Sequence, residues 1–215
     1  MKYRNKDFFI EGLKAKFLAK KFSTPVYCYS YNEIKNLYFF PSGRWDLQLQ
    51  NNIILIGHSM GGLIATQLAY DVDLSVSGLI LSSTHLGFGY PKGNALMERY
   101  SNRLETFSSK QSDIHYAMER AQRNTPEGTS QEVIEFLANV ALSIRLESIR
   151  DGGRMSQETD NTIICNNLKV PVLILSGAKD TVISSEMHSS LLAALPGATE
   201  VVFPNAGHAS YAEYP

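Results

Sequence analysis

The segment most able to do chemistry is Gly57-His58-Ser59-Met60-Gly61-Gly62. It follows the apolar run 53–56 and precedes a helical pattern over residues 63–70. A Gly-x-Ser-x-Gly segment between a buried strand and a helix is typical of a nucleophile elbow, a strained turn that lifts the serine hydroxyl above the sheet. Glycines are expected there because larger side chains would clash in the turn. The segment therefore predicts that Ser59 is a catalytic nucleophile.

The helix that follows the elbow would begin at Met60. Its first turn would direct unpaired backbone N–H groups, and the positive end of the helix dipole, at the site. Such groups stabilise a developing oxyanion. We therefore expect Met60 to contribute through its backbone N–H and not through its thioether.

A serine hydroxyl needs a neighbouring base, usually a histidine that a carboxylate orients. Asp180 and His208 follow the segments 172–175 and 200–203, which are predicted to be strands. Both would lie at the carboxyl ends of strands, where catalytic groups of open α/β sheets collect. The order Ser59, Asp180, His208 is also the order of the elbow fold, which favours the acid and base roles. The alternatives are a turn or helix-terminal acid for Asp180 and an exposed loop histidine for His208.

The other histidines are weaker candidates. His58 is expected to support the site or line the pocket instead of acting as the base, because it points away from Ser59. His85 could line the cleft or lie on a loop, and His115 and His188 are expected to be solvated on helices.

No cofactor and no metal are predicted. Histidine, aspartate and glutamate do not cluster at metal-ligand spacing, and the phosphate-binding and dinucleotide-binding glycine patterns are missing from the sequence. Cys28 and Cys165 lie far apart, which predicts neither a disulfide framework nor a thiolate zinc site. A reducing, cytoplasmic location fits this cysteine usage.

Composition narrows the possible partners. The chain has 215 residues, 44% of them hydrophobic, and a net charge of -1. A chain of this size can bury a core as one domain with an insertion. Near-neutral charge excludes a general attraction to nucleic acid or anionic lipid, and no apolar run is long enough for a membrane span. The expected partner is a small, nearly neutral ester or acyl substrate, and nothing in the sequence specifies an oligomeric state.

Apolar runs alternate with helical patterns along the chain. Runs at 53–56, 79–81, 172–175 and 200–203 have strand character, and the first should be buried on both faces. Helical patterns cover 63–70 and 187–195, and an apolar stripe over 6–21 predicts a further helix. A strand is expected at 26–31, and a short helix with a loop within 32–51. This alternation predicts an α/β fold with a doubly wound, mostly parallel sheet.

A long segment without strand character separates the runs at 79–81 and 172–175. It exceeds what a crossover connection needs, so we expect an inserted helical subdomain. Thr129 and Glu132 fit a capping box at the start of one helix, and a second helix is expected before Pro126. The predicted division is a core of residues 1–85 and 166–215 with a helical cap of residues 86–165.

The chain resembles the α/β-hydrolase superfamily, in the branch whose elbow reads Gly-His-Ser-Met-Gly-Gly. The resemblance is carried by residues 57–62, 175–180 and 205–208. It implies that Ser59, Asp180 and His208 are nucleophile, acid and base, and that residues 86–165 form a helical cap over the pocket. Ser59 argues against epoxide hydrolases and haloalkane dehalogenases, which use aspartate there. Esterases, lipases, lactonases, thioesterases and C–C hydrolases remain.

The chain departs from the family at its amino-terminal end. The family carries its second oxyanion donor in a His-Gly loop after its third strand, whereas the first histidine here is His58 and only Gly12 and Gly43 precede Gly57. The resemblance thus implies a fold truncated at the N-terminus, with strands one to three before Met1, and lacking the final helix, which would begin near Pro215.

Two functions are consistent with these observations. The first is a serine hydrolase that cleaves a small carboxylic ester or lactone through an acyl-enzyme on Ser59. The second is a truncated or degenerate relative, either a non-catalytic fragment or a small-molecule-binding protein. The presence of Ser59, Asp180 and His208 favours the first, and the missing oxyanion loop favours the second.

Overall fold

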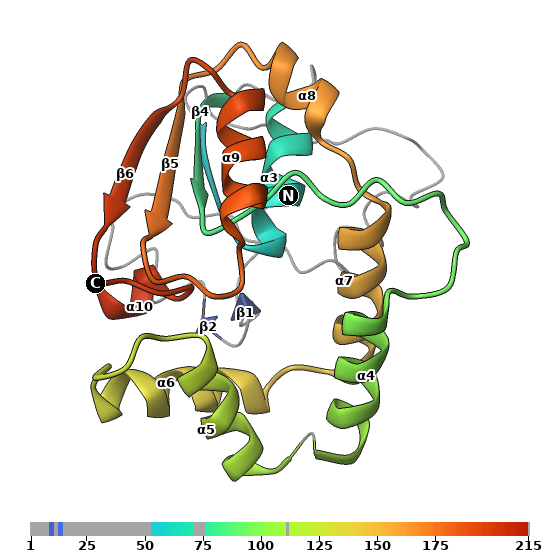
Figure 1. Cartoon of the computed structure of the whole chain (residues 1–215), viewed down its shortest axis with the longest axis vertical. Coiled ribbons are helices and arrows are strands. Elements are labelled where there is room, and N and C mark those ends of the chain that lie inside the picture. Colours follow the sequence, from blue (N-terminus) through green and yellow to red (C-terminus); the bar gives the residue numbers. More distant parts are fainter. Residues whose placement is uncertain (1–8, 11–12, 15–52, 71–75, 111, 215) are drawn as a thin grey trace, which may run out of the picture.

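The computed structural model describes residues 9–10, 13–14, 53–70, 76–110 and 112–214. Four parallel strands and their connecting helices form the core (Figure 1). In chain order, the elements from residue 53 onward are β3 (Ile53–His58), α3 (Met60–Tyr70), β4 (Val76–Ser82), α4 (Glu98–Lys110), α5 (Ile114–Arg123), α6 (Gln131–Leu142), α7 (Leu146–Glu158), α8 (Thr162–Asn167), β5 (Val172–Gly177), α9 (Ser185–Ala194), β6 (Thr199–Phe203) and α10 (Ser210–Glu213).

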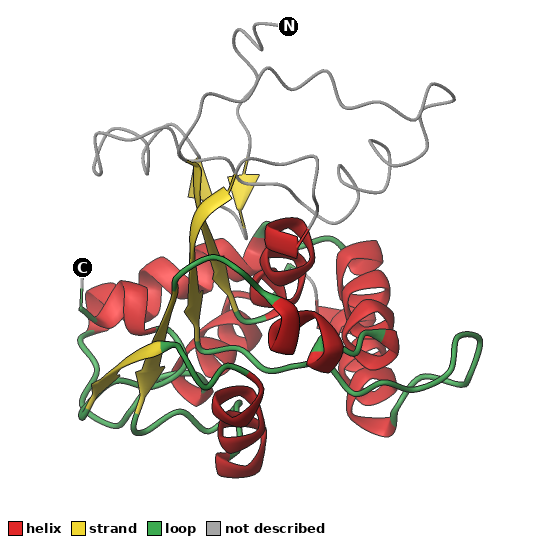
Figure 2. Ribbon diagram, turned by 90° about the horizontal axis from the view of Figure 1, so that it is seen from above, coloured by secondary structure: helices red, strands yellow, loops and turns green. Residues whose placement is uncertain are grey.

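The sheet has the order β3-β4-β5-β6, and every neighbouring pair is parallel. In register, Leu81 lies opposite Gly57 on one side and Ile174 on the other. The strand layer is twisted, as parallel sheets are (Figure 2). These features confirm the prediction of a parallel sheet of the α/β-hydrolase type. They also bring the carboxyl ends of all four strands to one edge.

One face of the sheet is covered by α3, α8 and α9. Leu79, Leu81 and Ile174 on that face are at most 1% exposed and pack with residues of the three helices. Leu191 of α9 and Cys165 of α8 belong to the same cluster. Burying an aliphatic side chain of this size stabilises the fold by about 1.5–3 kcal/mol, which explains why the strands are apolar runs.

The opposite face of β3 differs from the prediction. Ile54 and Ile56 are 61% and 57% exposed, so the expectation that this strand is buried on both faces is wrong. The reason is that side chains alternate between the faces of a strand: Leu55 packs with the cluster under α3, α8 and α9, so Ile54 and Ile56 point to the other face.

Five helices lie between β4 and β5 in the chain, and four of them, α4 to α7, lie beyond the carboxyl edge of the sheet (Figure 1). Helices α5 and α6 pack through small residues, among them Ala117, Ala121 and Ala138. Phe107, which is 1% exposed, joins Tyr116 and Ile149 in a second cluster that links α4, α5 and α7. The helices predicted before Pro126 and after residue 130 are therefore confirmed.

The predicted capping box is wrong by one residue. Helix α6 is capped by Ser130, whose Oγ accepts a hydrogen bond from the N–H of Val133. Thr129 is occupied in the preceding turn, where its N–H and its hydroxyl both donate to the carbonyl oxygen of Pro126. The next residue, Ser130, therefore takes the cap position.

The predicted helix over residues 6–21 is also wrong where it can be compared. Phe9–Ile10 (β1) and Leu13–Lys14 (β2) pair as antiparallel strands. Phenylalanine and isoleucine favour extended backbone, and an apolar pattern over a short segment does not separate helix from strand. The strand expected at 26–31 and the short helix expected within 32–51 lie outside the described residues.

Candidate active site

Ser59 occupies the turn between β3 and α3 with a left-handed backbone, at a φ of 51°. Few non-glycine residues adopt this conformation, and it persists where surrounding contacts hold it. Two hydrogen bonds do so here. The Ser59 N–H donates to the carbonyl oxygen of Ser82 (2.9 Å), and the Thr84 hydroxyl donates to the Ser59 carbonyl oxygen (2.6 Å).

The glycines around Ser59 have different roles. A Cβ atom on Gly57 would lie 2.5 Å from the carbonyl oxygen of Gly61, and one on Gly62 would overlap the side chain of Thr84. A Cβ on Gly61 would meet no described atom within 4 Å. The expected steric need for glycine is thus confirmed at Gly57 and Gly62 and is wrong at Gly61.

The three residues named as a triad meet at the carboxyl edge of the sheet. His208 Nε2 lies 3.0 Å from Ser59 Oγ, and His208 Nδ1 lies 2.9 Å from Asp180 Oδ2. The residues come from the turn after β3 and from the loops after β5 and β6. His208 is 7% exposed, so this hydrogen-bonded chain is shielded from water at its centre.

Asp180 is placed to remain ionised. Burial alone would raise its pKa, but the hydrogen bond and charge of His208 and the N–H groups of Ile183 and Val182 outweigh burial and lower the pKa. The carboxylate oxygen Oδ1 accepts from Val182 at 2.7 Å and from Ile183 at 3.0 Å. These bonds fix Oδ2 toward the imidazole. An ionised acceptor at Nδ1 leaves Nε2 of a neutral His208 able to accept the serine proton.

The loop that carries His208 is held from three directions. His58 Nε2 donates to the His208 carbonyl oxygen (2.8 Å), and the His208 N–H donates to the carbonyl oxygen of Asn124 (3.0 Å). The N–H of Gly207 donates to Glu213 Oε2 (2.7 Å). His58 therefore holds the backbone of the His208 loop and is not positioned as the base.

Met60 is the first residue of α3, so its backbone N–H has no acceptor within the helix. Its side chain points the other way, toward α7, where a Cβ on Gly152 would lie 2.5 Å from the Met60 sulfur. The neighbouring Gly153 makes a similar close approach to the ring of Tyr100 in α4. The turn after β3 and two helices of the insertion thus meet at this glycine pair.

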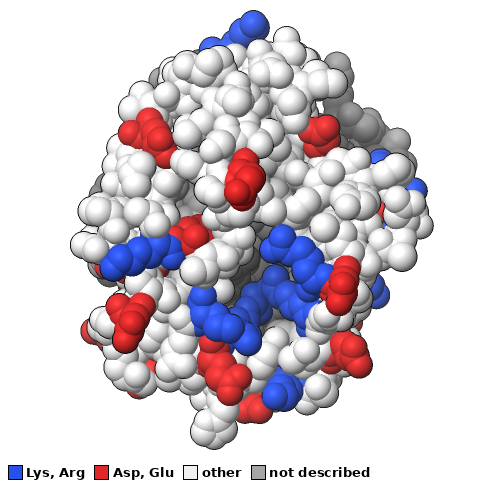
Figure 3. All heavy atoms as spheres, in the orientation of Figure 1, with Lys and Arg blue, Asp and Glu red and all other residues white. Residues whose placement is uncertain are grey.

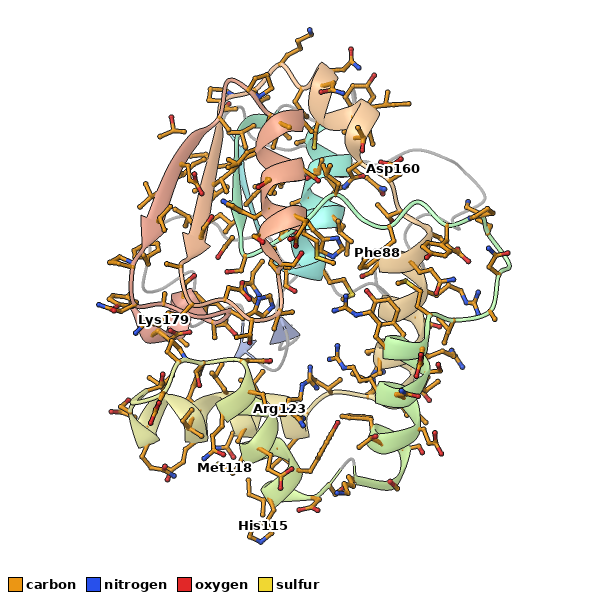
Figure 4. All side chains as sticks on the ribbon, viewed as in Figure 1. Phe88, His115, Met118, Arg123, Asp160 and Lys179 are labelled. Carbon is orange, nitrogen blue, oxygen red and sulfur yellow. The ribbon has the colours of Figure 1, made fainter. Side chains whose placement is uncertain are left out.

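The remaining histidines and Cys165 differ in their burial and in their hydrogen bonds. His85 is half-buried after β4, and its Nδ1 accepts from the N–H of Gly87 at 3.0 Å. His115 is exposed on α5 as expected and points away from the core (Figure 4). The expectation for His188 is wrong, because it is half-buried and bonded to Glu200 at 2.7 Å. Burial raises the pKa of the Cys165 thiol to about 11, which makes it unreactive.

Sequence reasoning did not find Thr84, Asn124 or Glu213, which position the turn and the loop just described. Thr84 carries a weak signal, since it follows a strand end rich in serine. Asn124 acts through its carbonyl oxygen and Glu213 through a contact that depends on the fold, so neither has a side-chain pattern to detect.

Neither a metal site nor a membrane-spanning helix is found in the described ranges. No three histidine, cysteine, aspartate or glutamate residues among them are close enough to hold an ion. None of their helices combines the length and the apolar character needed to cross a bilayer.

Comparison with known proteins agrees with the fold. The model of the Hydrolase_4 family, described as serine aminopeptidase, S33, matches residues 45–214. Phospholipase YtpA of Bacillus subtilis (strain 168) is 29% identical over 139 residues, 63% of this chain and 51% of that protein. Pimeloyl-[acyl-carrier protein] methyl ester esterase of Pectobacterium atrosepticum is 27% identical over 174 residues, 78% of this chain and 68% of that protein.

Among solved structures, a thermophilic esterase from Thermogutta terrifontis, with malate bound, has a TM-score of 0.65 and 28% identity. The match covers 85% of this chain and 65% of the esterase. This chain spans about half the length of the phospholipase that it matches. Because the family match runs from before the Ser59 turn to beyond the His208 loop, the chain belongs to the Hydrolase_4 (serine aminopeptidase, S33) family of α/β-hydrolases.

Proposed function

We propose that this protein is a serine hydrolase that cleaves a small carboxylic ester or lactone through an acyl-enzyme on Ser59. The observation that carries the proposal is the continuous chain from Ser59 Oγ to His208 Nε2 (3.0 Å) and from His208 Nδ1 to Asp180 (2.9 Å). Three groups at these distances can move one proton away from the nucleophile and return it to the leaving group.

In the first half-reaction, Ser59 Oγ attacks the carbonyl carbon while His208 Nε2 takes the hydroxyl proton. The oxyanion of the tetrahedral intermediate accepts a hydrogen bond from the Met60 N–H at the positive end of α3. Collapse of the intermediate breaks the bond to the alcohol oxygen, which receives the proton from His208. Asp180 stabilises the imidazolium and holds its orientation throughout.

In the second half-reaction, water attacks the acyl-enzyme. His208 removes a proton from the water, the second tetrahedral intermediate again places its oxyanion at Met60, and the proton returns to Ser59 Oγ as the acid leaves. No cofactor or metal enters either step.

Ester chemistry is favoured by the relatives. One is a methyl ester esterase, one a phospholipase and one an esterase, and each of these names describes cleavage of an ester. We further propose that residues 86–165 act as the cap that covers the substrate.

The test is labelling with a fluorophosphonate, which reacts with activated serines. We expect the purified chain to be labelled, and Ser59→Ala and His208→Ala to abolish labelling while circular dichroism shows a folded protein. Ser189→Ala, which removes an exposed hydroxyl of α9, is the matched control and should label like the wild type. A folded wild-type chain that takes no label would instead favour the alternative function, a degenerate and non-catalytic relative.

A further inference from the structure

Four side chains form a continuous wall from the end of β4 to the start of α4: His85, Phe88, Arg99 and Tyr100. The rings of His85 and Phe88 are 5.1 Å apart, and those of Phe88 and Tyr100 are 6.3 Å apart. The mechanism proposed above uses none of these side chains. We call this set the His85–Arg99 wall.

Arg99 is held over the two aromatic rings of this wall. Its guanidinium carbon lies 5.5 Å from the centre of the Phe88 ring and 5.4 Å from that of Tyr100. Among the described residues, no carboxylate pairs with it. Stacking on aromatic faces orients a guanidinium while leaving its N–H groups able to donate to an anion. Within the described part of the chain, Arg99 is thus an exposed cation that is stacked on two rings and is not paired with a carboxylate.

His85 is a neutral donor beside this cation. Its Nδ1 accepts from the Gly87 N–H, so a neutral ring carries its proton on Nε2. Burial, reinforced by the charge of Arg99, lowers the pKa of His85 to about 4. The ring therefore stays uncharged near neutral pH. It can offer one N–H to a ligand without taking up a proton.

The wall adjoins residues that contact the Ser59 turn. His85 directly follows Thr84, whose hydroxyl bonds to the Ser59 carbonyl oxygen, and the charge of His208 also opposes protonation of His85. On the other side, Gly152 contacts Met60 and Gly153 contacts Tyr100, so the wall adjoins the residue that would hold the acyl oxygen. The acyl part of a substrate would lie against it.

The surface view shows local positive charge on the face of the molecule that carries Phe88. Lys and Arg side chains gather around a hollow near the centre of the face in Figure 3, and Figure 4 shows Phe88 and Arg123 on opposite sides of the same region. The net charge of -1 does not reveal this arrangement, because it averages over the whole chain. The expectation of a nearly neutral substrate was based on that average.

We propose that Arg99 and His85 bind a free carboxylate on the acyl part of the substrate, so that the substrates are monoesters of short dicarboxylic acids. This rests on the proposed serine hydrolase function and names its substrate class. The guanidinium supplies a charge-assisted pair, which is directional because its N–H groups form a planar fork. The His85 N–H supplies one further donor to the same carboxylate.

The test compares two matched esters, 4-nitrophenyl hemiglutarate, which has a terminal carboxylate, and 4-nitrophenyl valerate, which ends in a methyl group. We expect kcat/KM to favour the charged ester, and Arg99→Met to lower that preference by about tenfold or more, as loss of a charge-assisted bond requires. His85→Leu should lower it as well, whereas His85→Gln, which keeps an N–H at the same position, should retain most of it.

Arg150→Met is the matched control. It removes an arginine of α7 that already pairs with Asp151 at 2.8 Å, and it should leave the preference unchanged. Equal kcat/KM for the two esters, or a preference that Arg99→Met does not change, would overturn the inference while leaving the serine hydrolase function in place.

A second measurement does not depend on turnover. Glutarate binding to the folded Ser59→Ala protein should be detectable by calorimetry and should weaken by about tenfold or more in Ser59→Ala/Arg99→Met. If neither ester is cleaved but this binding and its loss are observed, the hydrolase function fails and the carboxylate site stands. If glutarate binds equally to both proteins or to neither, the carboxylate site fails.

Discussion

The backbone N–H of His208 donates a hydrogen bond of 3.0 Å to the carbonyl oxygen of Asn124, at the end of α5. The loop of Asp180 reaches the same helix end, since the Thr181 hydroxyl donates to the carbonyl oxygen of Arg123 (3.2 Å). The acid and base loops therefore both hold the insertion at one point. A displacement of α5 would move His208 through its backbone.

A substitution at Gly207 tests the link between the His208 loop and the end of α5. A Cβ at this position would lie 2.8 Å from Pro126 Cδ and 3.0 Å from the carbonyl oxygen of Asn124, so Gly207→Ala must push the turn after α5 away from His208. We expect kcat to fall by about tenfold or more, because small displacements of catalytic groups are costly. Gly197→Ala, where a Cβ would meet no described atom within 4 Å, should keep full activity in the same ester assay.

The glycines of the Ser59 turn should differ in their tolerance of a methyl group. Gly57→Ala and Gly62→Ala place Cβ against backbone or against Thr84, and we expect each to lower the free energy of unfolding by about 1–3 kcal/mol. Gly61→Ala adds a methyl group in open space within α3 and should raise it by up to about 1 kcal/mol. Urea unfolding of the three variants measures the order, and a Gly61→Ala loss as large as that of Gly57→Ala would contradict this assignment.

Asp180→Asn should keep the shape of the site while removing the charge. An amide at this position favours the wrong tautomer of His208. In the Ser-His-Asp triad of serine proteases, the same Asp-to-Asn change lowers kcat by about 10⁴. We therefore expect a loss on the order of 10³ to 10⁴ in ester hydrolysis with an unchanged circular dichroism spectrum. A loss below tenfold would show that Asp180 does not orient the base.

The carboxylate of Asp180 should also contribute to the dependence of stability on pH in acid. The pKa of Asp180 is lower in the folded protein than its ordinary value of 3.8, so its stabilising contribution is complete above that value and is lost as pH falls below it. Wild type should therefore lose melting temperature more steeply than Asp180→Asn as the pH falls below about 4. Parallel curves for the two proteins would mean that another carboxylate causes the acid loss.

Much of this site could be predicted from the sequence because its parts follow strand ends. Ser59, Asp180 and His208 each lie a few residues after a predicted strand, and parallel strands bring such positions to one edge. The helices α5 and α6 were also predicted from their apolar spacing, whereas α4, α7 and α8 were not.

The contacts that hold the site together could not be predicted. The bond from His208 to Asn124 joins residues far apart in the chain through backbone atoms alone, and the wall of His85 and Arg99 depends on how α4 lies against the end of β4. At Phe9–Ile10 the local pattern was consistent with either helix or strand, and the antiparallel pairing decided the outcome.

We expect Glu213 to stabilise the His208 loop through its hydrogen bond to Gly207 and not through its negative charge. Its Oε2 accepts from the Gly207 N–H (2.7 Å), while Oε1 is buried without a hydrogen-bond partner among the described residues. Burial, together with the nearby charge of Asp180, raises the pKa of Glu213 above its ordinary value of 4.5. A raised carboxyl pKa means that the ionised form costs stability, and this cost grows as pH rises through the folded value.

Two variants separate the hydrogen bond from the charge. Glu213→Gln keeps an oxygen for Gly207 and removes the buried charge, so its melting temperature at pH 8 should equal or exceed that of wild type. Glu213→Leu leaves the Gly207 N–H unpaired, which costs about 1–3 kcal/mol, and should lower both stability and kcat because the His208 loop loosens. Thermal unfolding at pH 5 and pH 8 with ester kinetics measures both effects. If Glu213→Gln were as damaging as Glu213→Leu, the charge itself would be required at this position.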